Sequence, residues 1–94
     1  MKIKWTSRGL SDLARLHEFL AARNAAAAAR VVRMLVDAPE TLPTNPRLGE
    51  QLFEFDGREV RKIIVGRYEM RYEIRDSIIY VLRIWHTREN RRQA

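Results

Sequence analysis

The residue best suited to acid–base chemistry is His86, which stands between Arg83 and Arg88 near the C-terminal end of the chain. Metal-independent RNA cleavage needs a base for the 2′-hydroxyl, an acid for the leaving oxygen and a cation beside the phosphate, and this trio supplies such groups. Arg61 is a further candidate phosphate ligand, and Glu50 is a candidate base only if its loop folds back. The plainer interpretation, a histidine that ends a strand beside solvent, is favoured over catalysis.

Other catalytic and metal-binding patterns are missing from the sequence. It has no Ser-His-Asp order, no glycine-rich phosphate loop and no carboxylate cluster suited to a metal ion. With no cysteine, it forms neither a disulfide nor a thiolate zinc site, which is compatible with a reducing cytoplasm. His17 falls within an apolar helix face and is predicted to be packed or to face a partner. We therefore expect no metal and no cofactor.

Trp85 lies next to His86 and is also flanked by arginines, a pattern typical of protein or nucleic-acid contact surfaces. Strand alternation, however, places Trp85 on the face shared by Ile79, Val81 and Arg83, where it would belong to the core. Both interpretations of Trp85 stay open.

Two helices are expected to position this C-terminal segment. A strand over residues 2–6 is followed by a helix that Thr6 or Ser7 can cap. Spacing of about 3.6 residues puts six side chains on the core-facing side of this helix: Leu10, Leu13, Ala14, His17, Leu20 and Ala21. Asn24 can cap a second helix over residues 25–37, which Pro39 ends. The short connection predicts an antiparallel hairpin.

The second half of the chain has the alternation of β-strands. Residues 39–51 are expected to form a loop, and strands are predicted over residues 60–65, 67–75 and 78–85, with turns at Gly57, Gly66 and Asp76-Ser77. Arginines and glutamates alternate on one sheet face, which indicates a solvated surface laced with ion pairs. The predicted fold class is therefore α+β, with the order β-α-α-β-β-β(-β) and the helical hairpin packed on one face of a small, mostly antiparallel twisted sheet. Residues 1–94 are expected to form a single domain.

The helical hairpin carries more apolar surface than one core face can cover, because a domain of this length has a shallow core. We predict that a partner covers the surplus, although a deeply buried hairpin is the alternative. The candidate partner-binding residues are Leu16, Phe19, Val31, Met34 and Leu35.

A net charge of +6 favours association with nucleic acid or with an acidic protein segment. Residues 83–94 carry four arginines against one glutamate, which fits either a solubilising tail or a cationic contact surface. No apolar run approaches the length that spans a bilayer, and the N-terminal residues lack the pattern of a secretory signal. The expected location is the cytoplasm, without membrane association.

Taken with the helical hairpin, the runs VRKIIVGRYEMRY at residues 60–72 and IIYVLRIWHTR at residues 78–88 resemble those of the RelE/ParE toxins. The resemblance covers essentially the whole chain, and the strand ending in His-x-Arg is its most specific part. It implies the toxin of a type II toxin–antitoxin system, of the kind linked to plasmid stabilisation and growth inhibition. Its partner would be a ParD-like antitoxin with an amphipathic C-terminal segment, in a hetero-oligomer.

This family divides into ribosome-dependent messenger RNA endonucleases and ParE-like inhibitors of DNA gyrase. In the nuclease branch an arginine follows the first aromatic or histidine of the strand that matches residues 68–72, but here that position is Glu69, which would repel the phosphate. We therefore favour a non-enzymatic gyrase inhibitor, with target-binding candidates Trp85, His86, Arg88 and Arg91. The alternatives are a metal-independent endoribonuclease using His86, Arg83 and Arg88, and a non-toxic basic nucleic-acid-binding module.

Overall fold

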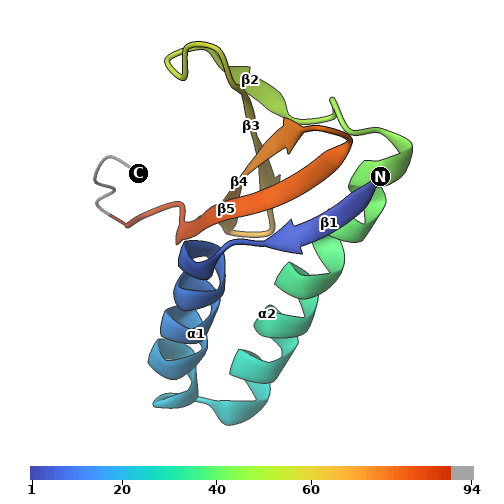
Figure 1. Ribbon diagram of the computed structural model, residues 1–94. Coiled ribbons are helices and arrows are strands. Elements are labelled where there is room, and N and C mark those ends of the chain that lie inside the picture. The colour runs from blue at the N-terminus through green and yellow to red at the C-terminus, as the bar shows by residue number, and fades with distance from the viewer. Residues whose placement is uncertain (90–94) are drawn as a thin grey trace.

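The computed structural model describes residues 1–89 and shows two helices against a five-stranded sheet (Figure 1). The elements follow the predicted order, which confirms the α+β fold class. In chain order they are β1 (Lys2–Trp5), α1 (Ser7–Ala21), α2 (Ala25–Asp37), the 3₁₀-helix η1 (Ala38–Thr44), β2 (Glu50–Leu52), β3 (Glu59–Val65), β4 (Tyr68–Arg75) and β5 (Ile78–His86).

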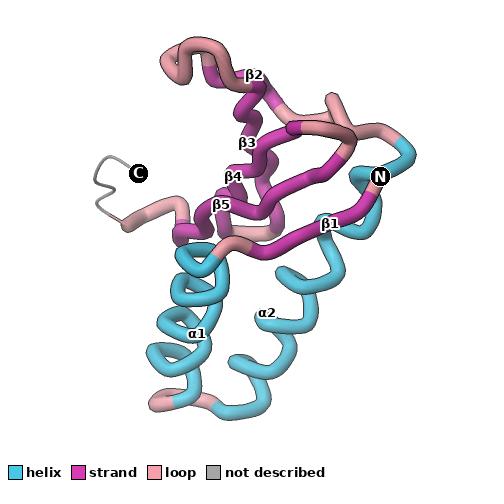
Figure 2. Tube along the Cα trace, in the orientation of Figure 1, coloured by secondary structure: helices cyan, strands magenta, loops and turns pink. Residues whose placement is uncertain are grey.

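The strands lie in the order β1-β5-β4-β3-β2, and all neighbours are antiparallel except β1 and β5. The parallel pair follows from the helical hairpin, which returns the chain to the sheet before β2 begins (Figure 2). Tight turns join the later strands. Gly66 has a φ of 61° between β3 and β4, and Asp76 and Ser77 both adopt positive φ between β4 and β5, as a two-residue hairpin loop requires.

The segment predicted as a loop over residues 39–51 is more ordered than expected. Pro39 occupies the first turn of η1, where a missing N–H has no cost, so the chain continues as a 3₁₀-helix after α2. Glu50 already belongs to β2, which pairs with β3. Tyr72 holds this segment against the core, because its hydroxyl accepts from Gly49 N at 2.9 Å and donates to the Pro46 carbonyl at 2.7 Å. Burial raises the pKa of the Tyr72 hydroxyl.

The core lies between the helices and one sheet face. Its larger cluster contains Leu16 and Leu35 from the helices and Met70, Val81 and Ile84 from the sheet. At the other end of the sheet, a smaller cluster joins η1 to β4 and β5. The tip of the helical hairpin extends away from the sheet (Figure 1), so the sheet covers only part of the helical surface.

A β-bulge in β5 overturns the predicted placement of Trp85. Arg71 pairs with Arg83 whereas Tyr72 pairs with Val81, so Leu82 is an extra residue in β5. An extra residue shifts the alternation by one position, and every side chain beyond it changes face. Ile84 therefore joins Val81 in the core, and Trp85 lies on the opposite face, under the guanidinium groups of Arg71 and Arg83.

The inward face of α1 also differs from the prediction. Its buried residues are Gly9, Asp12 and Leu16, whereas Leu10 remains 52% exposed and His17 is exposed. The apolar pattern gave the wrong face because Gly9 and Asp12 are buried. Neither is strongly hydrophobic, so the pattern predicted that both would face solvent. Among residues 1–89, no helix is long and apolar enough to cross a bilayer.

Candidate partner-binding groove at the end of β5

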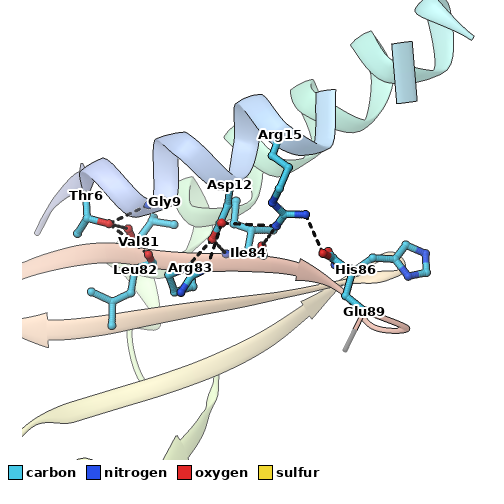
Figure 3. A network of polar contacts seen from close by, with 10 residues as sticks. All are labelled: Thr6, Gly9, Asp12, Arg15, Val81, Leu82, Arg83, Ile84, His86 and Glu89. Carbon is cyan, nitrogen blue, oxygen red and sulfur yellow. Dashed lines mark hydrogen bonds and ion pairs between the residues drawn. The ribbon is translucent and has the colours of Figure 1, made fainter. Parts of the chain in front are cut away.

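The exposed edge of β5 is the feature that positions the candidate site. β1 pairs with β5 only as far as Val81, so the edge of the remaining strand needs other hydrogen-bond partners. Thr6 supplies the first of these partners. Its hydroxyl donates to the Val81 carbonyl at 2.9 Å and, as the cap of α1, accepts from Gly9 N at 3.0 Å (Figure 3). A Cβ at Gly9 would lie 2.6 Å from the Val81 carbonyl oxygen, so only glycine allows α1 to approach this closely.

Asp12 accepts the hydrogen bonds of the next residues along the β5 edge. Its Oδ2 accepts from Ile84 N at 2.9 Å and from Arg83 Nε at 2.8 Å (Figure 3). Arg15, one turn further along α1, donates to the Ile84 carbonyl at 3.3 Å and lies 3.4 Å from Asp12 Oδ1. The buried carboxylate thus takes the place of a neighbouring strand and fixes α1 to β5.

A short turn after β5 is held to the same helix. Glu89 accepts from His86 N at 2.8 Å through one carboxylate oxygen and from Arg15 at 2.7 Å through the other. His86 Nδ1 accepts a hydrogen bond from Arg88 N at 3.0 Å. These contacts fix the position of the backbone that carries His86 and Arg88.

The turn and α1 enclose a groove, which we call the β5-end groove, of about 630 Å³. Its apolar part includes Leu16, Phe19, Leu20 and Tyr68, and the His86 ring stands edge-on to Tyr68 with centroids 5.2 Å apart. Polar side chains complete the lining: Arg15, Arg67, His86, Arg88 and Glu89. Burial, with a smaller contribution from Glu89, raises the pKa of the Tyr68 hydroxyl, so Tyr68 presents a neutral surface at physiological pH.

The residues proposed for RNA cleavage are not gathered into one site. His86 faces the helices, whereas Arg83 lies on the opposite side of the sheet, stacked on Trp85 and bound to Asp12. Arg88 lines the β5-end groove with His86, but Arg83 does not. Glu69 stands beside Trp85 across the β4–β5 ladder, on the same face as Arg83.

The other two candidate groups for cleavage lie further away along the sheet. Arg61 pairs in register with Tyr72, whereas His86 pairs with Tyr68 near the start of β4. The guanidinium of Arg61 donates to the Gly49 carbonyl at 2.7 Å and to Glu59 at 2.9 Å. Glu50, the candidate base, lies 3.9 Å from Lys62 in the β2–β3 ladder rather than near His86.

The sheet face opposite the helices is laced with ion pairs. Arg58 forms two hydrogen bonds to Glu73, and Arg71 lies 3.8 Å from Glu69. The hydrogen bond from Arg58 outweighs burial and lowers the pKa of Glu73. Arg8, Arg58, Arg71 and Arg83 line a shallow pocket on this face, but three of these four are already paired with carboxylates.

The residues predicted to bind an antitoxin divide into buried and accessible groups. Leu16 and Leu35 are 4% and 0% exposed and belong to the core of this conformation. Val31 and Met34 are half-buried against the same core. Phe19 is 61% exposed, with the Arg23 guanidinium 5.3 Å from its ring centroid.

The predicted target-binding residues divide in the same way. Trp85 is 5% exposed, beneath the arginines of the sheet face opposite the helices. His86 and Arg88 line the β5-end groove, and Arg91 lies outside the described residues. The sequence suggested separate surfaces for target and antitoxin, but Phe19 lies in the same groove as His86 and Arg88.

Sequence reasoning missed several residues of the groove: Arg15, Leu20, Arg67 and Tyr68. The sequence of the β4–β5 hairpin did contain a signal for Arg67 and Tyr68. A two-residue turn at Asp76-Ser77 sets the register in which β4 pairs with β5. The bulge displaces that register by one residue, and the observed pair is Tyr68 with His86. Among residues 1–89, no group of three or more histidine, aspartate or glutamate side chains is placed to hold a metal ion.

Comparison with known proteins places this architecture among toxins of type II toxin–antitoxin systems. The fold is similar to that in a solved structure of the chromosomal ParDE toxin–antitoxin system from P. aeruginosa, with a TM-score of 0.77 and 21% identity, covering 92% of this chain and 95% of the other. The chain is also 29% identical over 85 residues to Toxin RelE2 of Caulobacter vibrioides, covering 90% of this chain and 93% of that protein.

The family itself is established by a match over residues 3–91 to the model described as the ParE toxin of the type II toxin-antitoxin system parDE. The chain therefore belongs to the ParE toxin family. Membership in this family also implies an antitoxin as partner.

Proposed function

We propose that this ParE-family toxin inhibits DNA gyrase without cleaving RNA and is neutralised by a ParD-like antitoxin. The observation that carries the proposal is the separation of the cleavage groups, because His86 and Arg83 lie on opposite sides of the sheet. Glu69 adds a carboxylate on the Arg83 side, where a nuclease would need to stabilise developing negative charge.

The proposed contact surface for gyrase is the end of β5, through His86 and Arg88. Arg88 is exposed, and its side chain forms no ion pair with residues 1–89. The backbone around it is fixed by Glu89 and Arg15, so a contact made by Arg88 loses less conformational entropy than one made by a free tail. Arg91 is proposed to extend this surface.

The first test is gyrase-catalysed supercoiling of relaxed plasmid in the presence of increasing amounts of the purified chain. We expect supercoiling to fall for the wild type and to be about tenfold less sensitive to Arg88→Ala. Arg33→Ala is the matched control, because Arg33 is an exposed arginine on α2. Undiminished supercoiling at excess wild-type protein would refute gyrase as the target.

The relative named Toxin RelE2 makes ribosome-dependent cleavage the second candidate. Primer extension on messenger RNA translated with and without the chain tests it directly. Cuts that need active ribosomes and disappear in His86→Ala would replace the gyrase proposal. If neither assay responds and the chain binds DNA with a strong salt dependence, the nucleic-acid-binding alternative replaces both.

A further inference from the structure

The edge strand β1 carries positive charge on the sheet face opposite the helices (Figure 1). Ile3 and Trp5 pack toward the core, so strand alternation places Lys2 and Lys4 on the opposite face, about 7 Å apart. Both lysines are exposed, and neither forms a side-chain ion pair with residues 1–89. The edge of the sheet therefore presents two ammonium groups to solvent.

Two arginines extend this charge beyond the edge strand. Lys2 pairs with Ile78, which in turn pairs with Arg75 of β4, so two strand spacings, about 10 Å, separate Lys2 from Arg75. Arg8, in the first turn of α1, lines the shallow pocket on the same face. Both arginines are exposed and form no ion pair with residues 1–89. The cluster, which we call the β1 patch, consists of Lys2, Lys4, Arg8 and Arg75.

Carboxylates do not offset the charge of the β1 patch. On β1, β4 and β5, the acidic residues of this face are Glu69 and Glu73, and each is only 4% exposed. Glu73 is bound to Arg58, and Glu69 lies 3.8 Å from Arg71, so arginines outside the patch already match both charges. Asp76, in the turn after β4, forms no ion pair with residues 1–89. Four positive charges are thus available to a ligand.

Lysines on an edge strand have a plainer explanation, because they discourage pairing with another chain. That explanation covers Lys2 and Lys4. It does not cover Arg8, which belongs to a helix, or Arg75, which belongs to a strand with neighbours on both sides. The β1 patch therefore extends further than protection of the edge requires.

The side chains of the β1 patch also limit its ligand. Exposed lysines and arginines spread over a sheet face suit an anion that is repeated at intervals, as in a nucleic-acid backbone. Bases of a single strand would need an aromatic ring on which to stack. Tyr80, the aromatic residue beside Lys4 in the sheet, is half-buried, and the Arg75 guanidinium lies 4.7 Å from its ring centroid. A duplex needs no such ring, because its phosphates face outward.

We propose that the β1 patch binds the phosphate backbone of duplex DNA without reading its sequence. The choice of DNA as the duplex rests on the proposed function, because gyrase acts on DNA. A toxin bound to gyrase through the end of β5 would then also contact the DNA that gyrase holds.

Fluorescence anisotropy of a short labelled DNA duplex, titrated with the full chain at several salt concentrations, measures this binding without gyrase. Four phosphate contacts give a slope of about −3.6 in a plot of log K against log salt concentration. The wild type should therefore bind about fiftyfold more tightly at about 50 mM salt than at about 150 mM salt.

Lys4→Gln/Arg75→Gln removes half of the β1 patch at two exposed positions. We expect its salt slope to fall to about −1.8 and its affinity at low salt to fall about tenfold or more. Arg30→Gln/Arg33→Gln is the matched control, because it removes the same charge from exposed positions on α2, which packs on the other sheet face. The control should keep the wild-type slope. Circular dichroism and the melting temperature verify that both variants are folded.

Three results would overturn the inference. The first is no binding of duplex DNA by the wild type at low salt. The second is equal weakening by the two double variants, since binding would then follow net charge rather than the β1 patch. The third is binding of a duplex RNA of the same length about tenfold more tightly than DNA. If DNA binding depends on the β1 patch but the wild type leaves supercoiling unaffected, the DNA site stands and gyrase alone is refuted.

Discussion

Replacement of Asp12 by alanine should destabilise the protein more than most substitutions in α1. Asp12→Ala leaves Ile84 N without its acceptor, and an unsatisfied buried N–H costs about 1–3 kcal/mol. It also removes the carboxylate that pairs with Arg83, whose side chain is only 17% exposed. Breaking a buried ion pair costs about 3–5 kcal/mol. The two costs overlap, and Arg83 keeps its contact with Trp85, so we expect a loss of about 3 kcal/mol.

That loss is large for a chain of 94 residues, because stability of roughly 0.05–0.15 kcal/mol per residue gives a total of about 5–14 kcal/mol. Urea denaturation followed by circular dichroism measures it, and at a slope of about 1–1.5 kcal/mol/M the midpoint should fall by roughly 2–3 M. Asp12→Asn retains an oxygen for Ile84 N and should lose about half as much.

Asp37→Ala is the control for this experiment. Asp37 is exposed at the end of α2 and makes no side-chain capping hydrogen bond, so its loss should change stability by less than about 0.5 kcal/mol. A loss below about 1 kcal/mol for Asp12→Ala would show that α1 does not stabilise the edge of β5 in the way described.

Two further perturbations test other parts of the structure. Tyr72→Phe removes a buried hydroxyl that bonds to Pro46 and Gly49, and should cost about 1–3 kcal/mol in a thermal melt without changing the fold. Glu73→Gln should cost about 1 kcal/mol at pH 7, because Arg58 is half exposed and the pair is partly screened. Since the pKa of Glu73 is lowered in the folded state, its stabilisation is present above the unfolded carboxyl pKa of about 4.3 and is lost as pH falls through the folded value. Urea midpoints of wild type and variant should therefore converge as the pH falls below the lowered pKa of Glu73, and a difference that stays constant as the carboxyl is protonated would contradict the assignment.

The sequence predicted elements that depend on local signals. The α2 boundaries at residues 25–37 were correct because Asn24 supplies the cap and Pro39 marks the change of helix type. The turns at Gly66 and Asp76-Ser77 were correct because those positions need positive φ. The family resemblance was confirmed as well. The signals for the helix and the turns are each contained within a few neighbouring residues, whereas the resemblance extends over essentially the whole chain.

The errors share a different cause, which is hydrogen bonding between distant parts of the chain. Asp12 is buried only because β1 ends at Trp5 and leaves the edge of β5 unpaired, and no local pattern contains that fact. The faces assigned to Trp85 and His86 depend on the extra residue in β5. The β5-end groove exists because Asp12 fixes α1 to the end of β5. The sequence gives no sign of that contact, so sequence reasoning placed the groove residues on two separate surfaces.

Leu82 has a consequence for any length change in β5. Deleting this single residue would leave Val81 opposite Tyr72 and Arg83 opposite Arg71 in a regular ladder, so Trp85 and His86 would keep their present faces. A strand that kept Leu82 but lost the bulge would instead carry Trp85 to the side of the helices and turn His86 toward the charged face. Alignments and chimaeras across this strand must therefore keep the bulge as well as the residue types, because the bulge decides which side chains reach the groove.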